Sequence, residues 1–349
     1  MAVLELEGVT KVFKSSLRGR HLYTLGPIDL SIEAGEVFGY LGPNGAGKTT
    51  TIKLAMSLLR PTSGRARCFG EPCGSARARR RVGFLPEHPY FYQHLTAREL
   101  LEFYADVSGL SRRDGARRAG ELLEAVGLAG SADTAVSKLS KGMIQRIGLA
   151  QALVGDPDLI ILDEPLSGLD PVGRREFRDL ILDLGRRGKT VFFSSHVLQD
   201  VEMVCDRVGI LAGGKIIKVA SVAEILQQSV EWVEIQVDQL QAETARSLRV
   251  GEVSRHGDKM VVRVPGCGEV NGAIARLMAA GGRIAAVLPV RRTLEDYFLN
   301  QLAGAGHRTT APEARPAAPS GRQAPSAGPA SGDGREAEST LLEERAERR

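Results

Sequence analysis

Short apolar runs alternate with stretches of helical periodicity through residues 1–218, a pattern typical of a parallel sheet whose strands are joined by crossover helices. The clearest predicted strands cover residues 36–41, 82–85, 159–162 and 191–194. The run LIIL at 159–162 is apolar throughout, as expected of a strand that is covered on both faces. The pattern predicts an α/β domain over residues 1–220, with a mostly helical subdomain at about 95–155.

The pattern of hydrophobic and polar residues changes after residue 220. Val233, Ile235 and Val237 alternate with Glu234 and Gln236, which is the periodicity of a half-buried strand. Further strands are predicted at 260–264 and 283–290, and one face of a predicted helix carries Leu294, Tyr297, Phe298 and Leu302. Residues 221–303 are therefore expected to form a small α+β domain.

Residues 304–349 contain five prolines and no valine, isoleucine or aromatic residue. Such a segment cannot bury enough apolar surface to offset its ordering entropy, so we expect a disordered tail.

Composition and charge exclude several classes of protein. The apolar fraction of 43% and the charged fraction of 25% are those of a globular chain, not of a collagen, a disulfide scaffold or a wholly disordered protein. The formal net charge of +4 is too small to indicate nucleic acid or an anionic membrane as a partner. No apolar run approaches the roughly 18 residues of a membrane span, and residues 1–14 alternate like a strand, unlike a signal peptide. We expect a soluble protein whose membrane role, if any, comes through a partner.

A glycine-rich loop is the strongest chemical signal in the chain. Residues 42–49 read GPNGAGKT, with two glycines separated by four residues and followed by Lys and Thr. The loop follows an apolar strand and opens a helical run, which is the context that a phosphate-binding loop requires. We expect Lys48 to contact the β- and γ-phosphates and the Thr49 hydroxyl to ligate Mg²⁺. The predicted nucleotide-binding residues of this loop are Gly42, Pro43, Asn44, Gly45, Ala46, Gly47, Lys48, Thr49 and Thr50.

Two adjacent acids, Asp163 and Glu164, follow the LIIL strand. Ligands of open α/β sheets bind outside the carboxyl ends of the strands, so these carboxylates should meet the phosphates there. Asp163 is predicted to hold Mg²⁺, directly or through water, and Glu164 to orient and deprotonate the attacking water. The alternative is a solvated turn that happens to carry two acids.

Two further positions extend this predicted site. His196 follows the strand VFFSS and could donate a hydrogen bond to a γ-phosphate oxygen, although a lone histidine is often structural. Ser140 is a good N-cap for the amphipathic helix that begins LSKGMIQR, and with the bare backbone of Gly142 it makes a second anion site. Considered locally, this second site is only a capped helix.

The motifs GPNGAGKT, LSKGMIQR, LIILDEP, SGLD and SSH occur in this order, and the set resembles the nucleotide-binding subunit of an ABC transporter over about residues 3–220. The resemblance implies a P-loop NTPase fold with a parallel core sheet, an antiparallel N-terminal β part and a helical subdomain. It also implies an ATPase coupled to transmembrane transport, with ATP and Mg²⁺ as cofactors.

The resemblance further implies that two such domains pair head to tail around two ATP molecules. Each nucleotide would lie between the phosphate loop of one domain and the Ser140 and Gly142 helix end of the other. Asp170 in SGLD would lie at the dimer interface, and Phe13 would replace the family's tyrosine as the ring stacked on adenine.

This sequence departs from the family pattern at two places. Lys141 and Met143 replace the second and fourth residues of the usual Ser-Gly-Gly-Gln, whereas Ser140 and Gly142 are retained, so we expect hydrolysis to survive. Glu87 stands where the family usually carries a glutamine that senses Mg²⁺, and its carboxylate can still coordinate a metal ion. Glu87 and the small C-terminal domain resemble a branch of exporters whose ATPase is a separate polypeptide.

The implied partners are an integral membrane permease and a second copy of this chain or a paralogous ATPase, at the inner face of the cell membrane. Tyr90, Phe91 and Tyr92 are expected to line the groove that receives a short permease helix, whereas Phe103 and Tyr104 are equally compatible with a subdomain core. The arginines at 77 and 79–81 fit a solvated helix face better than a nucleic-acid patch.

Two other functional readings compete with export. A soluble ABC protein that acts on ribosomes or DNA is the main alternative, but only one phosphate loop and no long heptad tract occur in the chain. An importer ATPase is the other, and Glu87 and the short C-terminal unit argue against it.

Overall fold

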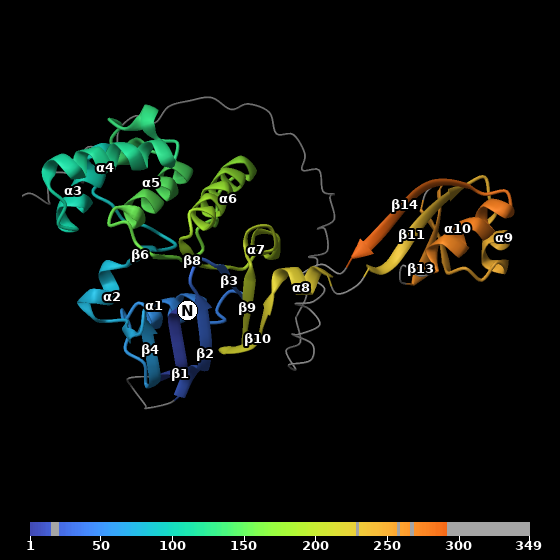
Figure 1. Cartoon of the computed structure of the whole chain (residues 1–349), viewed down its shortest axis with the longest axis horizontal. Coiled ribbons are helices and arrows are strands. Elements are labelled where there is room, and N and C mark those ends of the chain that lie inside the picture. The colour runs from blue at the N-terminus through green and yellow to red at the C-terminus, as the bar shows by residue number, and fades with distance from the viewer. Residues whose placement is uncertain (15–20, 228–229, 257–258, 266–268, 292–349) are drawn as a thin grey trace, which may run out of the picture. The chain divides into compact units, whose positions relative to one another are not determined.

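A computed structural model describes residues 1–14, 21–227, 230–256, 259–265 and 269–291 (Figure 1). The predicted helix at 294–302 and the predicted tail at 304–349 lie outside the described residues. The strands fall into three sheets, with orders β2-β1-β4-β5, β10-β9-β3-β8-β7-β6 and β12-β13-β11-β14.

The six-stranded sheet is the core of the α/β region. Its strands are β3 (Val37–Leu41), β6 (Val82–Leu85), β7 (Leu159–Leu162), β8 (Thr190–Ser195), β9 (Arg207–Ala212) and β10 (Lys215–Ser221). The first five run parallel and β10 pairs antiparallel with β9. The parallel sheet predicted from the apolar runs is confirmed, including the fully buried LIIL strand.

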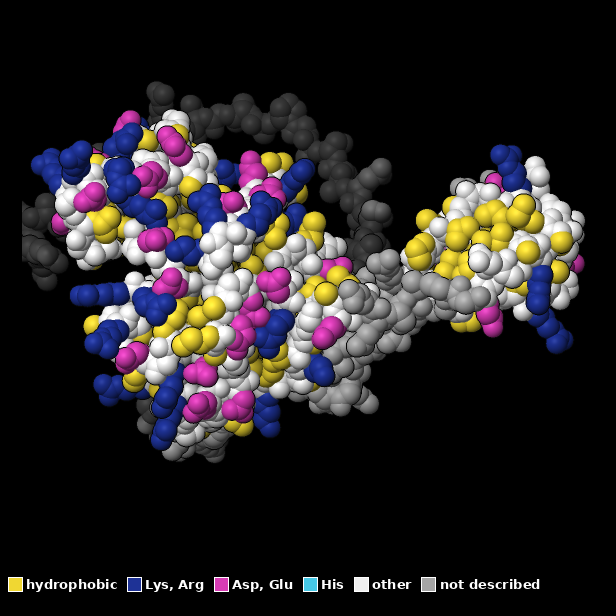
Figure 2. All heavy atoms as spheres, viewed as in Figure 1, with side chains coloured by type: hydrophobic (Ala, Val, Ile, Leu, Met, Phe, Trp, Pro, Cys, Tyr) yellow, Lys and Arg dark blue, Asp and Glu magenta, His cyan; other side chains and the backbone are white. Residues whose placement is uncertain are grey.

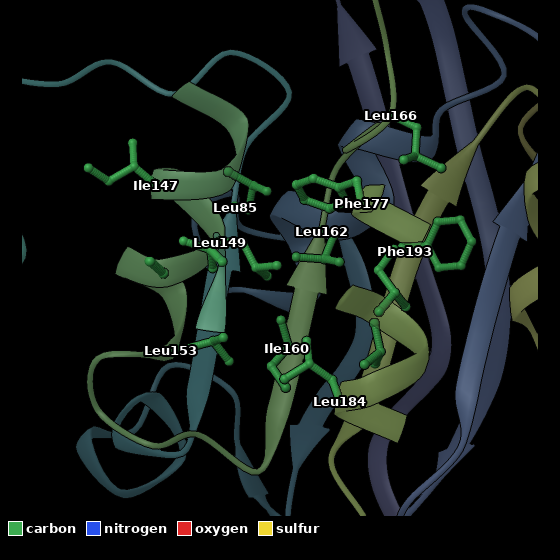
Figure 3. Close-up of a cluster of buried hydrophobic side chains, with 14 of the residues drawn as sticks. Leu85, Ile147, Leu149, Leu153, Ile160, Leu162, Leu166, Phe177, Leu184 and Phe193 are labelled. Atoms are coloured by element: carbon green, nitrogen blue, oxygen red, sulfur yellow. The ribbon is translucent and has the colours of Figure 1, made fainter. Parts of the chain in front are cut away.

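The two faces of this sheet alternate residue by residue along β7. Ile160 and Leu162 pack with Phe177, Leu184 and Phe193 on one face (Figure 3). Leu159 and Ile161 pack on the other face in a second cluster. Burial on both faces explains why the sequence of this strand is apolar without alternation.

The antiparallel sheet closes over that second face. It contains β1 (Ala2–Lys14), β2 (His21–Glu33), β4 (Ser63–Cys68) and β5 (Glu71–Pro72). Leu4, Leu6 and Ile28 of this sheet share the cluster with Phe38 and Tyr40 of β3. The sequence pattern did not predict β2 or β4 as strands, and the antiparallel part followed from the resemblance alone.

The helices divide between the core sheet and a subdomain. The bounds in residues 1–227 are α1 (Lys48–Ala55), α2 (Ala76–Arg80), α3 (Ala97–Val107), α4 (Arg112–Ala125), α5 (Lys141–Leu153), α6 (Pro171–Arg186), α7 (Leu198–Val204) and α8 (Val222–Gln227). Helices α3, α4 and α5 pack on one another and fill the predicted helical stretch. A capping box at Thr96 and Glu99 begins α3, and Ser111 caps α4.

The third sheet has its own elements and its own core. Its strands are β11 (Val230–Asp238), β12 (Glu252–His256), β13 (Lys259–Pro265) and β14 (Arg283–Arg291), with helices α9 (Ala242–Ser247) and α10 (Val270–Ala279). Val233, Ile235 and Val237 are buried with Val262 and Leu277, as the alternation predicted.

The visible surface carries charges of both signs. Figure 2 shows Lys and Arg side chains interspersed with Asp and Glu over residues 1–227. On α2 the arginine side chains are exposed and only Ala78 is buried, which agrees with a solvated helix face.

Candidate active site

Three strand ends meet where the predicted site residues lie. The order of the core sheet places β8 between β3, which leads into the glycine-rich loop, and β7, which leads into the two acids. All three strands are parallel, so their carboxyl ends lie at one edge of the sheet. The backbone amide of Gly42 donates to the carbonyl of Ser195, 3.3 Å away, which ties the loop after β3 to the end of β8.

The glycine-rich loop has the backbone that its sequence predicts. Gly45 and Gly47 take left-handed φ angles of 80° and 110°. A side chain at Gly47 would also collide with Leu25, whose Cδ1 lies 2.5 Å from the ideal Cβ position. Helix α1 begins directly after Gly47 without a side-chain cap, so its first amides are open to an anion.

Lys48 is buried at the first position of α1, directly after this loop. Only 6% of the residue is exposed, and its ammonium donates to the carbonyl oxygen of Gly42 at 2.7 Å. Its Nζ also lies 3.0 Å from Oε1 of Glu164, in an ion pair that is buried on both sides. The lysine charge is thereby held at the mouth of the loop.

Asp163 lies beside Thr49 at the first turn of α1. The Thr49 hydroxyl donates to Oδ1 of Asp163 at 3.2 Å, and the Ser194 hydroxyl donates to the same oxygen at 2.8 Å. Burial raises the pKa of Asp163, the two hydroxyl donors oppose this rise, and the nearby Glu87 and Glu164 carboxylates add to it. A cation at this carboxylate would relieve its desolvation.

Glu164 is held by three contacts in a left-handed conformation, with φ of 47°. Its backbone amide donates to the Ser194 hydroxyl at 2.9 Å. Its side chain joins Lys48 through Oε1 and the imidazole Nδ1 of His196 through Oε2, the latter at 2.8 Å. The structure thus brings the three residues predicted to be catalytic into direct contact.

A cavity of about 480 Å³ opens over these groups. Its lining consists of Tyr23, Asn44, Gly45, Gly47, Lys48, Thr49, Thr50, Glu87, Glu164, Ser167 and His196. Glu87 therefore reaches the same space as the phosphate loop.

Tyr23 and Ser167 are cavity residues that the sequence reasoning missed. The Tyr23 hydroxyl donates to the carbonyl oxygen of Ala46 at 2.9 Å, and its ring lies 6.4 Å from that of Phe13. Among the described residues it is Tyr23, not Phe13, that lines the cavity. No local motif marks Tyr23, because its contact depends on the pairing of β1 with β2.

The second predicted anion site lines a different cavity, of about 580 Å³. Ser140 caps α5 by accepting from the amide of Met143 at 3.3 Å, and Asp170 caps α6 in the same way with Gly173. The lining includes Ser140, Lys141, Gly142, Met143, Gly168 and Asp170. Within one chain, Ser140, Gly142 and Asp170 are therefore not part of the phosphate-loop cavity.

The oxygen donors near the loop suit Mg²⁺. Thr49 and Asp163 touch, and both supply the hard oxygen ligands that this ion prefers. No cluster of three or more acidic, histidine or cysteine side chains able to hold a metal occurs within the described parts of the chain. Mg²⁺ commonly uses one or two carboxylates together with substrate phosphates and water, so the donor set fits.

The predicted docking surface is partly aromatic. Tyr90 is 91% exposed, and Tyr92 packs edge-on against Phe103, with ring centres 5.6 Å apart. Phe91 is buried beside Tyr104 in the core cluster, so the prediction that Phe91 lines a surface groove was wrong. Its ring turns inward because the subdomain core supplies apolar neighbours that the local sequence does not reveal.

A separate hollow of about 770 Å³ is lined by none of these aromatic residues. Its lining includes Arg79 and Arg80 of α2, Phe84, Pro86, and Val107 at the end of α3.

Within the described residues, no helix is both long and apolar enough to cross a membrane.

Comparison with known proteins gives relatives over most of the chain. The family model for ABC transporters matches residues 25–167. An uncharacterized ABC transporter ATP-binding protein of Synechocystis sp. is 38% identical, over 88% of this chain and 87% of its own length. The bacitracin transport ATP-binding protein BcrA of Bacillus licheniformis is 35% identical, over 86% and 98%. A fluoroquinolones export ATP-binding protein of Mycobacterium tuberculosis is 39% identical, over 64% and 72%.

A solved structure gives the same fold. A dimeric ATP-binding cassette in a post-hydrolysis state, bound to ADP and Pi, superposes with a TM-score of 0.57. It is 26% identical, and the match covers 63% of this chain and 98% of that one.

Proposed function

The chain belongs to the family of ABC transporter ATP-binding proteins and is an ATPase, and from this premise we propose that it powers export through a separate membrane permease. The proposed catalytic mechanism rests on the Glu164 carboxylate. It lies 3.0 Å from Lys48 and 2.8 Å from His196 at the mouth of the phosphate loop. A carboxylate fixed on both oxygens beside a phosphate site is well placed to act as a general base.

The proposed roles follow from these contacts. The loop amides and Lys48 bind the β- and γ-phosphates, and a phosphate that pairs with Lys48 competes with Glu164 for the ammonium. Glu164 then accepts the proton of the attacking water, while His196, with both ring nitrogens protonated, donates from Nδ1 to the carboxylate and from Nε2 to a γ-phosphate oxygen. Tyr23, and beside it Phe13, provide the aromatic surface nearest the loop for the base of ATP.

Thr49, Asp163 and Glu87 are the residues proposed to hold Mg²⁺, which when bound neutralises charge on the phosphates. The contact between Thr49 and Asp163 supports this assignment, because both side chains supply the hard oxygen ligands that Mg²⁺ prefers.

The second cavity supports pairing with another ATPase chain. Ser140 and Asp170 are exposed and Gly142 is half-buried, and all three line a cavity that the phosphate loop of their own chain does not share. A head-to-tail second copy, or a paralogous ATPase, would bring this helix start to the phosphates of the facing nucleotide. The solved cassette is dimeric, which supports pairing of two such chains.

Export is proposed from the name of one relative and from the branch-like features of the chain, which are Glu87 and the C-terminal domain. The proposed partner is an integral membrane permease, and the proposed location is the cytoplasmic face of the cell membrane. Residues 1–220, 221–303 and 304–349 are proposed as the ATPase domain, a C-terminal domain and a tail. The relatives described above are transport proteins, and they give no support to a ribosome or DNA function.

The decisive experiment purifies the tagged chain from detergent-solubilised membranes together with its genetically neighbouring permease. We expect an integral membrane protein to co-purify and to change the ATPase rate on reconstitution. Tyr90→Asp, at a side chain exposed to 91%, should weaken this complex, whereas Leu58→Asp, at another exposed apolar residue, should not. Recovery of ribosomes or nucleic acid with no membrane protein would overturn the export proposal.

A further inference from the structure

Ser194 opens the SSH motif, in which only His196 has been given a role. It is the fifth residue of β8, and none of its surface is exposed. Strand β8 lies between the strand of the phosphate loop and the strand of the two acids, and Leu162 of β7 pairs with Phe193. The Ser194 side chain therefore projects at the point where β7 turns into the acid pair.

The hydroxyl of Ser194 makes two hydrogen bonds to that acid pair. It donates to Oδ1 of Asp163 at 2.8 Å and accepts from the backbone amide of Glu164 at 2.9 Å. One buried atom thus fixes the side chain of the first acid and the main chain of the second. Thr49 also reaches Asp163, at 3.2 Å, but it binds the side chain of one acid only.

These bonds matter because both acids are under physical constraint. Glu164 adopts a left-handed φ of 47°, a conformation that residues other than glycine rarely hold without support. Asp163 is buried, and an unsatisfied buried carboxylate is costly. A hydroxyl that bonds to both stabilises the turn and the orientation of the Asp163 oxygens together.

We propose that Ser194 is a positioning residue that sets the orientation of the Asp163 carboxylate and the main-chain turn of Glu164 for ATP hydrolysis. This inference rests on the proposed roles of Asp163 as a metal ligand and Glu164 as the base. Ser194 does not touch the cavity and acts through its two neighbours.

The test compares Ser194→Thr with Ser194→Val. The two replacements have nearly the same shape, so they disturb packing alike and differ in whether a hydroxyl is present. Thr190→Ala is the strand control, because Thr190 is a buried hydroxyl at the other end of β8 that accepts from the amide of Gly35 at 2.9 Å.

Three measurements separate positioning from general damage. Mn²⁺ affinity is measured by electron paramagnetic resonance in the presence of ADP, ADP affinity is measured without metal, and kcat and KM are measured for ATP. For Ser194→Val relative to Ser194→Thr we expect Mn²⁺ affinity to fall about tenfold and kcat about ten- to a hundredfold, as for loss of a hydrogen bond to a charged group. Metal-free ADP affinity should agree within about threefold, since the phosphate loop is untouched. By linkage, the KM for MgATP should rise about as much as the metal affinity falls.

Equal Mn²⁺ affinity and equal kcat in the Thr and Val variants would overturn the proposal, as would the same losses in Thr190→Ala. Ser194→Ala supplies a third comparison should the two larger side chains both prevent folding, with the same losses expected relative to wild type. Glu164→Gln distinguishes the two levels of the argument. If Glu164→Gln is inactive while Ser194→Val matches Ser194→Thr, only the role of Ser194 fails; if Glu164→Gln is active, the proposed base itself is wrong.

Discussion

The two cavities that carry the predicted nucleotide contacts are built in opposite ways. At the phosphate loop the charged groups are buried and already paired, with Lys48 exposed to 6% and Glu164 to 8%. At the start of α5, Ser140, Lys141 and Asp170 are exposed, and the helix offers its first amides to solvent. The difference indicates that the groups proposed for bond cleavage are assembled within one chain, whereas the second contact face is left for another molecule to complete.

Glu164→Gln is the strongest way to test the buried half of this comparison. The amide keeps the shape of the side chain but cannot accept the proton of water, so we expect turnover to fall by about 10²–10⁴ while ATP binding persists. Steady-state ATPase assays and nucleotide titration measure the two quantities. Near-normal hydrolysis would remove Glu164 from the role of base.

Lys48→Ala should act on binding as well as on turnover. Its ammonium is the charged donor at the loop, and loss of a charged hydrogen bond lowers affinity by about ten- to a hundredfold. A fluorescent nucleotide titration is the measurement, with Lys53→Ala, on an exposed part of α1, as the control. Unchanged affinity would contradict the phosphate-loop assignment.

Gly142→Ala tests the exposed half. A methyl group there would meet only the side chain of Leu169, at 3.8 Å among the described neighbours, so the fold should tolerate it. It would project where the phosphates of a facing nucleotide are proposed to lie. We expect ATP-dependent dimerisation of the Glu164→Gln protein, measured by light scattering, to be lost, and turnover of the otherwise wild-type chain to fall about tenfold.

The control for this prediction is Gly120→Ala on α4, where a methyl group would have open space within the described structure. It should leave both quantities unchanged. An intact dimer in the Gly142→Ala variant would mean that α5 does not face a second nucleotide.

Asp200 links the two halves and gives the smallest expected effect. It is buried in α7, which follows His196, and pairs at 3.3 Å with Arg178 and at 3.8 Å with Arg174 of α6, the helix that Asp170 caps. Burial raises the pKa of Asp200 even though the two arginines lower it. The carboxyl therefore contributes stability that is present below its unfolded pKa of 3.8 and is lost as the pH rises through the folded pKa.

Asp200→Asn removes this titration. The free energy of unfolding of wild type, relative to the variant, should fall by about 1.4 kcal/mol for each unit of pKa difference as the pH rises from 3.8 to 7. Urea unfolding at several pH values measures it. A difference that is flat or rises with pH would show that the arginine pairs outweigh burial.

Much of the α/β fold and of the phosphate-loop site was predictable from the sequence, because each strand or motif lies in a continuous stretch of residues. The LIIL strand, the glycine-rich loop and the acid pair can each be recognised from a few consecutive residues. The parallel topology then brings Lys48, Glu164 and His196 together. Ser194 and Tyr23 were missed since their contacts depend on strand order and pairing. For Ser194 one signal was available, a hydroxyl within the otherwise apolar run VFFSS.

The aromatic residues of the helical subdomain show the same limit. Tyr90 and Phe91 are neighbours of similar chemistry, yet one is 91% exposed and the other 5%. The packing of α3 and α5 decides which of the two rings is buried. The residues next to Tyr90 and Phe91 in the sequence do not reveal it.

The left-handed backbone at Glu164 carries an evolutionary consequence. A side chain in that conformation costs about 1–2 kcal/mol relative to glycine, so the main chain at this position favours a residue that cannot act as a base. Glycine at position 164 would relieve this strain but would leave the buried Lys48 ammonium without its carboxylate partner, so selection for heat tolerance alone should enrich glycine only together with loss of the lysine charge. Stability and activity therefore place different demands on the residue at position 164.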